Sequence, residues 1–333
     1  MRGIIYIFYF IICVRYSPLS SQDLVYSQHY ASPLTTNPAM TGVFNGSARL
    51  FANYRSQWNN IQTNTFLYQT PSASAEFSVP DKNIAVGFIL LNDQTNNKIF
   101  NTLEGGMSFG YKIRLNFFEI SLGIQGWYRQ VYFDQSKIRS SIISVEPSLL
   151  DSYSNLDLNT GAVATYVFPS EKSSLFYGAA VHHILAPRDQ VVNNTVSAYA
   201  LPMRFTFHTG GSFSIRDEFR IIPGLLASYQ SKSTQINFGT SVGFHFMWDE
   251  KDRPSGTLFV GSWFRTNETK IQAFIPQAGI EYNNFRIGLS YDYVVNGLSN
   301  GSGGRPNTFE LSLGYIFKTD KSTDFQCIYS PYF

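Results

Sequence analysis

The feature that most constrains the fold of this chain is a two-residue alternation of apolar and polar side chains that recurs along most of its length. In residues 285–293, for example, Phe285, Ile287 and Leu289 alternate with Arg286 and Ser290. Successive side chains of a β-strand point to opposite faces, so each such segment predicts a strand with one apolar face. We count about fourteen of them, most running to about ten residues, the length of a tilted strand that crosses a bilayer. They begin near residues 47, 66, 84, 99, 117, 156, 174, 203, 219, 234, 257, 271, 285 and 307.

A soluble β-sandwich also alternates, and the composition and the charges help to separate the two classes. Aromatic residues make up 16% of the chain and charged residues only 14%, whereas an average soluble domain has about 25% charged residues. An arginine on a lipid-facing surface costs about 2–4 kcal/mol at the bilayer midplane. The charges within the expected strands all fall on the polar face, which therefore lines a lumen filled either with ion pairs or with water. They are Arg49, Arg55, Glu76, Glu104, Glu119, Arg129, Arg204, Glu281, Arg286, Asp292 and Glu310.

The lengths of the connections also favour a membrane barrel. Connections after even-numbered segments are mostly tight, whereas long ones, at 134–155, 185–202 and 294–306, follow odd-numbered segments. Outer-membrane barrels have this asymmetry of short turns on one side and long loops on the other. Residues 248–256 are an exception, a nine-residue connection on the short side. We predict an all-β fold, a transmembrane antiparallel up-and-down β-barrel of about fourteen strands, within a range of 12–16.

The chain divides into four expected parts. Residues 1–21 carry Arg2, an uncharged apolar run and small residues at the end, the pattern of a cleaved secretory signal peptide. Residues 22–46 are polar and are expected to form an N-terminal periplasmic segment. The barrel is expected over 47–317, and residues 318–333 are either a C-terminal tail or the last strand. An outer-membrane location follows from this organisation.

Charge and cysteine content exclude other classes of protein. The 25 basic residues include Arg2 and Arg15 of the expected signal, and without these two the bases equal the 23 acidic residues. A chain with this balance has no basic footprint for nucleic acid. Only Cys327 lies outside the expected signal, so no internal disulfide is predicted.

The catalytic and metal-binding patterns in the sequence are better explained by structural roles. The sequence GTSVG at 239–243 matches a hydrolase nucleophile motif, but it lies inside an alternating strand rather than at a strand-to-helix turn. His208 and His245 fall on the lumen face, near Ser212 and Ser241, and a lumen hydrogen-bond network explains them better than a catalytic pair. The neighbours His182 and His183 are expected to point to opposite faces and so to share no metal. We therefore predict no enzyme, no cofactor and no metal site.

Beyond these patterns, residues 22–42, QDLVYSQHYASPLTTNPAMTG, resemble the N-terminal motif of the PorP/SprF family of type IX secretion outer-membrane proteins from the Bacteroidota. Similar stretches follow in the same order along the chain, including RSQW at 55–58 and LSYDY at 289–293. The residues that match the family's two N-terminal motifs are Gln22, Asp23, Ser27, Gln28, Pro33, Asn37, Pro38, Ala39, Gly42, Arg55, Gln57 and Trp58. The resemblance assigns no role to these residues, and contact with a partner protein is the hypothesis.

The resemblance implies a non-enzymatic component of the type IX secretion and gliding apparatus. Its implied partners are outer-membrane lipids, the periplasmic lipoprotein ring and motor components, and a large secreted surface protein such as an adhesin that it helps to export or attach. Two alternatives remain open. A channel or transporter for small solutes would explain the glycine-rich polar face, and a barrel-embedded hydrolase would use Ser241 or Ser212 with His245 or His208.

Overall fold

The structure is a computed structural model of the whole chain. It describes residues 23–58, 67–134, 152–168, 173–189, 199–249, 254–267, 270–295 and 307–317. The expected signal peptide, residues 1–21, and the tail 318–333 lie outside these ranges, as does Gln22.

Most of the described chain is strand. The barrel strands are β1 (Ala48–Gln57), β2 (Tyr68–Val79), β3 (Ile84–Thr95), β4 (Phe100–Leu115), β5 (Phe118–Phe133), β6 (Ser152–Phe168), β7 (Ser173–His182), β10 (Arg204–Arg216), β11 (Phe219–Gln230), β12 (Ser233–Trp248), β13 (Pro254–Asn267), β14 (Lys270–Tyr282), β15 (Phe285–Val294) and β16 (Thr308–Phe317). The short elements are η1 (His29–Ala31), α2 (Pro33–Thr36), η2 (Pro38–Met40), η3 (Pro80–Lys82), β8 (Arg188–Asp189) and β9 (Tyr199–Ala200).

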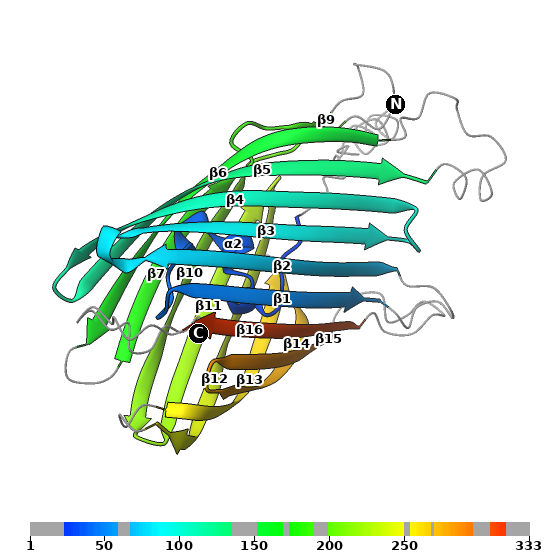
Figure 1. Ribbon diagram of the computed structural model, residues 1–333. Coiled ribbons are helices and arrows are strands. Elements are labelled where there is room, and N and C mark those ends of the chain that lie inside the picture. Colours follow the sequence, from blue (N-terminus) through cyan, green and yellow to red (C-terminus); the bar gives the residue numbers. More distant parts are fainter. Residues whose placement is uncertain are drawn as a thin grey trace, which may run out of the picture.

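The fourteen long strands form one closed antiparallel barrel, in which each strand pairs with its neighbours in the sequence (Figure 1). Ala48 of β1 pairs with Phe317 of β16, which closes the cylinder. β7 pairs with β10 because β8 and β9 form a separate two-stranded sheet within the connection between them. The predicted fold and strand number are thus confirmed. The connection predicted at residues 248–256 is shorter in the structure, since β12 continues to Trp248 and β13 begins at Pro254.

The barrel is apolar outside and charged inside. Leu156 and Val260 on the outer surface are 71% and 68% exposed, whereas the Arg49 and Glu76 side chains inside are 0% exposed. Lipid on the outer surface removes the penalty for such exposed apolar side chains, and buried charges are stable when they are paired. The predicted placement of the strand charges on the lumen face is confirmed. No helix in the described part of the chain is long and apolar enough to cross a membrane.

Residues 23–46, which we call the N-terminal segment, lie inside the barrel (Figure 1). This location differs from the expected separate periplasmic segment. Asp23 contacts His183 and Arg204, at the end of the barrel where the long connections lie. Ser47 bonds to Phe317, at the opposite end, where β1 begins. The segment therefore runs through the lumen from one end to the other.

Candidate functional site: the N-terminal segment inside the barrel

The fold of the N-terminal segment follows from its prolines and its short polar side chains. Pro33 and Pro38 occupy the first turns of α2 and η2, where a missing N–H has no cost. Asn37, between these two helices, caps η2 because its Oδ1 accepts a hydrogen bond from Ala39 N at 2.8 Å. These residues build a compact series of turns rather than a strand, so the segment fits within the cylinder.

Asn37 also fastens the segment to the barrel wall. Its side chain is fully buried. Its Nδ2 lies 3.2 Å from the carbonyl oxygen of Ala162 on β6 and 3.1 Å from that of Ala179 on β7. The same Nδ2 lies 3.0 Å from Nε2 of His208 on β10. One amide group thus joins the segment to three neighbouring strands.

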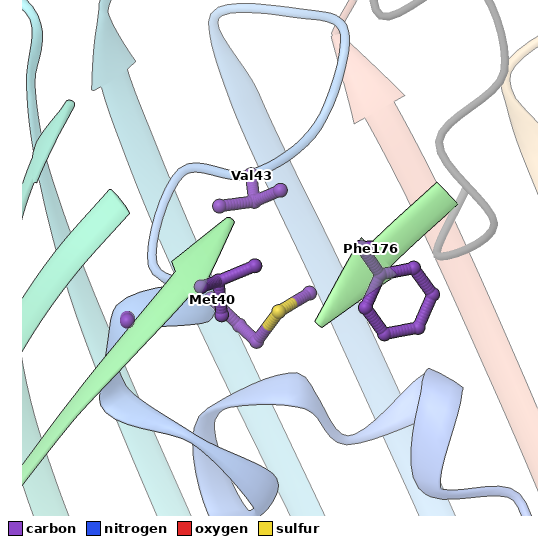
Figure 2. Close-up of a cluster of buried hydrophobic side chains, with 5 residues drawn as sticks. Met40, Val43 and Phe176 are labelled. Atoms are coloured by element: carbon purple, nitrogen blue, oxygen red, sulfur yellow. The ribbon is translucent and has the colours of Figure 1, made fainter. Parts of the chain in front are cut away.

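A small apolar cluster adds to this attachment. Ala39, Met40 and Val43 of the segment pack against Val163 of β6 and Phe176 of β7. Figure 2 shows Met40 and Val43 beside the ring of Phe176. All five side chains are buried, so the lumen here has a dry core.

Two wall glycines permit the close approach of the segment. A Cβ atom on Gly123 of β5 would overlap the backbone of Pro38 and Ala39. A Cβ atom on Gly161 of β6 would overlap the Asn37 side chain. Glycine at these positions leaves room for the turn at residues 37–39, which explains part of the glycine enrichment of the polar face.

Charged wall residues bind the backbone of the first part of the segment. Glu310 of β16 accepts hydrogen bonds from the N–H groups of Ser27 and Gln28, each at 2.9 Å. Arg55 of β1 donates to the carbonyl oxygen of Val25 at 2.6 Å and lies 3.4 Å from Glu310. These bonds have one ionised partner, which makes them stronger than neutral hydrogen bonds.

The Ser27 hydroxyl group is held by two further charges. It donates to Asp292 of β15 at 2.8 Å and accepts from Nη2 of Arg265 of β13 at 2.6 Å. Asp292 and Arg265 also pair with each other at 2.8 Å. The hydroxyl therefore joins an ion pair that the wall already makes.

The other end of the segment is bound in the same way. Gly42 N donates to Oε2 of Glu76 at 3.0 Å, and Lys112 of β4 donates to the Gly42 carbonyl oxygen. Glu76 in turn pairs with Arg49 at 2.8 Å. Buried charges on the wall thus contact the segment near both ends.

A charge cluster at the long-connection end holds Asp23. The Asp23 carboxylate is hydrogen-bonded with His183 and lies 3.2 Å from Arg204, while His183 Nδ1 lies 2.5 Å from Asp157. Burial opposes the charge on His183, but its bonds to Asp157 and Asp23 outweigh burial and raise its pKa to about 9. Burial would raise the pKa of Asp23, but Arg204 and His183 hold it well below its usual value. Both groups are therefore charged at neutral pH.

The structure gathers most of the motif residues around this segment. Of the twelve motif residues, eight lie in the segment and Arg55 contacts it. Gln22 falls outside the described residues. The remaining two, Gln57 and Trp58, lie away from the segment at the end of β1. Gln57 ends β1 and pairs with Thr308 and Tyr68. The Trp58 ring packs against that of Tyr68 at 5.2 Å. Sequence reasoning placed Glu310, Asp292 and Arg204 on the lumen face but did not identify their partner, because the segment has no periodicity that would orient it.

The serines and histidines considered as catalytic or metal-binding candidates make hydrogen bonds to other groups. His245 Nδ1 lies 2.8 Å from the Thr257 hydroxyl, and Ser241 accepts a hydrogen bond from Trp263. His182 and His183 are both buried, so the expectation that they point to opposite faces is wrong. His183 lies just beyond β7 with a φ of 61°, which breaks the alternation. In the parts of the chain described, no group of three or more His, Cys, Asp or Glu side chains is arranged to hold a metal ion.

A closed barrel with an apolar exterior, a charged interior and an internal segment of this kind defines the class, an outer-membrane β-barrel. The particular family follows from the sequence. The model of the family described as type IX secretion system membrane protein PorP/SprF matches residues 19–315, and the chain belongs to this family. No curated protein matches the chain.

Solved structures agree on the fold alone. The toluene transporter TbuX of Ralstonia pickettii superposes with a TM-score of 0.54 at 10% identity, over 86% of this chain and 94% of that one. The toluene transporter TodX of P. putida gives a TM-score of 0.50 at 9% identity, over 85% and 93% of the two chains. At this identity, the similarity carries no information about substrates.

Proposed function

We propose that this protein is a non-enzymatic component of the type IX secretion and gliding apparatus that supports export or surface attachment of a large surface protein such as an adhesin. The observation that carries the proposal is the occupied lumen. A solute pore needs a water-filled path, whereas here a segment that matches a family motif crosses the lumen and is bound by buried charges. The motif residues therefore fill the lumen, and the protein acts through partner proteins that bind to the two ends of the barrel.

The partners that we propose follow from the two ends of the barrel. The short turns face the periplasm in barrels of this class, so that end is the side on which a lipoprotein ring or motor component would bind. The long connections face the cell exterior, where a surface protein would be attached. Gln57 and Trp58 lie at the long-connection end of β1 and are candidates for such a contact.

The test is deletion of the gene, followed by quantitative mass spectrometry of surface and secreted proteins. We expect one or a few large surface proteins to disappear from the cell surface, with restoration by the native gene. An unchanged surface and secreted proteome, with unchanged adhesion and gliding, would reject the proposal.

The alternative, a channel for small solutes, makes a different prediction for the same strain. Loss of a channel would slow uptake of its solute and leave the secreted proteins unchanged. The neutral lumen lining of paired charges does not favour an ion or an acidic solute, and the segment lies across the path that a solute would take.

A further inference from the structure

The N-terminal segment has two parts that fill different halves of the lumen. Residues 23–28 we call the latch. Its residues Val25–Gln28 contact β1, β2 and β13–β16. Asp23, at the rim, contacts Gln230 of β11, Arg204 of β10 and His183. Residues 33–43, which we call the anchor, mainly contact β4–β7 and β10. Each part therefore lies mainly on its own side of the barrel, although Gly42 and Val43 of the anchor also reach Glu76 of β2 and Arg49 of β1.

Wall charges bind both parts, and the two parts differ in their apolar contacts. The latch is bound mainly through hydrogen bonds to wall side chains, most of them charged: Glu310, Asp292, Arg55, Arg265, His183, Arg204, Gln230, Ser72 and Ser312. The anchor contributes Met40 and Val43 to the apolar cluster with Val163 and Phe176. Departure of the anchor would expose this buried cluster to water, whereas the apolar side chains of the latch are the buried Tyr26 and the half-buried Leu24 and Val25.

The wall charges that bind the latch keep partners when the latch leaves. Glu310 remains paired with Arg55 at 3.4 Å, and Asp292 remains paired with Arg265 at 2.8 Å. His183 remains bonded to Asp157. A buried charge that loses its sole partner is strongly unfavourable. Because these wall charges also pair with one another, release of the latch leaves none of these three without a partner.

We propose that the wall around Glu310, Arg55, Asp292 and Arg265 is a peptide-binding site whose ligand is the chain's own latch, and that release of the latch opens its half of the lumen while the anchor stays bound. The site binds the main chain, since the Glu310 carboxylate accepts from the amides of Ser27 and Gln28, and the Arg55 guanidinium group donates to the carbonyl of Val25. The barrel is closed when the site is occupied and open on one side when it is not.

The test uses the full-length protein with D23N/S27A, which alters the latch but no wall residue. The matched control is T41A, which instead removes a 2.8 Å hydrogen bond from the anchor to Ser108 and a 2.7 Å hydrogen bond within the anchor to Pro38 O. Ion current in planar bilayers reports opening. Chymotrypsin reports which part moves, because Tyr26 lies in the latch and Phe44 directly follows the anchor, and both are buried in the closed state.

We expect a closed native protein and a closed control. In D23N/S27A we expect steady current, and cleavage after Tyr26 about tenfold faster than in the native chain or more, because the latch loses hydrogen bonds to charged groups and proteolysis follows the open population. Cleavage after Phe44 should not change. A variant as closed and protected as the native chain would overturn the proposal, as would current without cleavage after Tyr26 or equal acceleration at Phe44. Should D23N/S27A fail to assemble, D23N alone carries the same test.

Discussion

At the scale of single residues, the side chain of Asn37 joins the turn at residues 37–39 to three strands of the wall. We expect Asn37→Ala to destabilise the attachment of the segment by about 1–3 kcal/mol, because buried carbonyl oxygens and Ala39 N lose their partner. Chymotrypsin cleavage after Phe44 measures the effect and should accelerate.

The matched control for this substitution is Thr35→Ala. The Thr35 hydroxyl group is half-buried and donates to Ser32 of the segment itself, so its replacement should change the cleavage rate much less. Equal rates for the native chain and Asn37→Ala would show that the amide network does not hold the segment.

The His183 cluster predicts a dependence on pH at the long-connection end. The pKa of His183 in the folded protein is about 9, above the ordinary value of about 6.5. The contribution of the protonated ring is therefore complete below about pH 6.5 and is lost as the pH rises through about 9. The charged and titratable groups around the ring are Asp23, Asp157, Arg204, His182 and Glu104.

We accordingly expect cleavage after Tyr26 to accelerate between pH 7 and pH 10 in the native protein. In His183→Gln the rate should be higher at pH 7 and should change little over this range, since the side chain no longer titrates. A pH profile that is the same in both proteins would assign the dependence to another group.

At the scale of elements, the fit between β5 and the turn at residues 37–39 depends on Gly123. A Cβ there overlaps the backbone of the segment, whereas a Cβ on Gly126 of the same strand has no neighbour within 4 Å. We expect Gly123→Ala to displace the segment and to destabilise the protein by about 1–3 kcal/mol.

Gly126→Ala is the control, because it adds the same methyl group to the same strand without a collision. It should leave the midpoint of thermal unfolding and the cleavage after Phe44 unchanged or slightly improved. If both variants behaved alike, strand propensity rather than contact with the segment would explain the effect.

The strands could be predicted from the sequence, whereas the N-terminal segment could not be placed. In a strand such as Phe285–Val294, the two-residue alternation predicts which side chains lie on each face, and the length of the strand matches the thickness of the bilayer. Residues 23–46 have no period, and their partners, such as Glu310, lie up to 283 residues away along the chain. The expectation that His182 and His183 point to opposite faces fails because the alternation ends at His183, where the backbone leaves the strand at a positive φ.

One signal in the sequence could have indicated that a piece of chain lies inside the barrel. Several charges and glycines share the polar face of the strands, and buried charges of both signs need partners at hydrogen-bond distance. Gly123 and Gly161 leave space that a wide, water-filled lumen would not require. Together these features indicate that a piece of chain lies inside, although not which piece.

At the scale of the whole molecule, the barrel presents apolar side chains to lipid and fills its interior with its own chain. Our central proposal is that this barrel of the PorP/SprF family acts through proteins that bind to its ends. The N-terminal segment lies in the lumen, across the path that a solute would take through the closed barrel.

The most direct test is affinity purification of the tagged full-length protein from native outer membranes in mild detergent, with mass spectrometry of the proteins that accompany it. The account predicts recovery of other type IX secretion components, above all a periplasmic lipoprotein or motor component, together with a large surface protein. Recovery of the barrel alone, in a preparation where other secretion components are intact and copurify with one another, would contradict it.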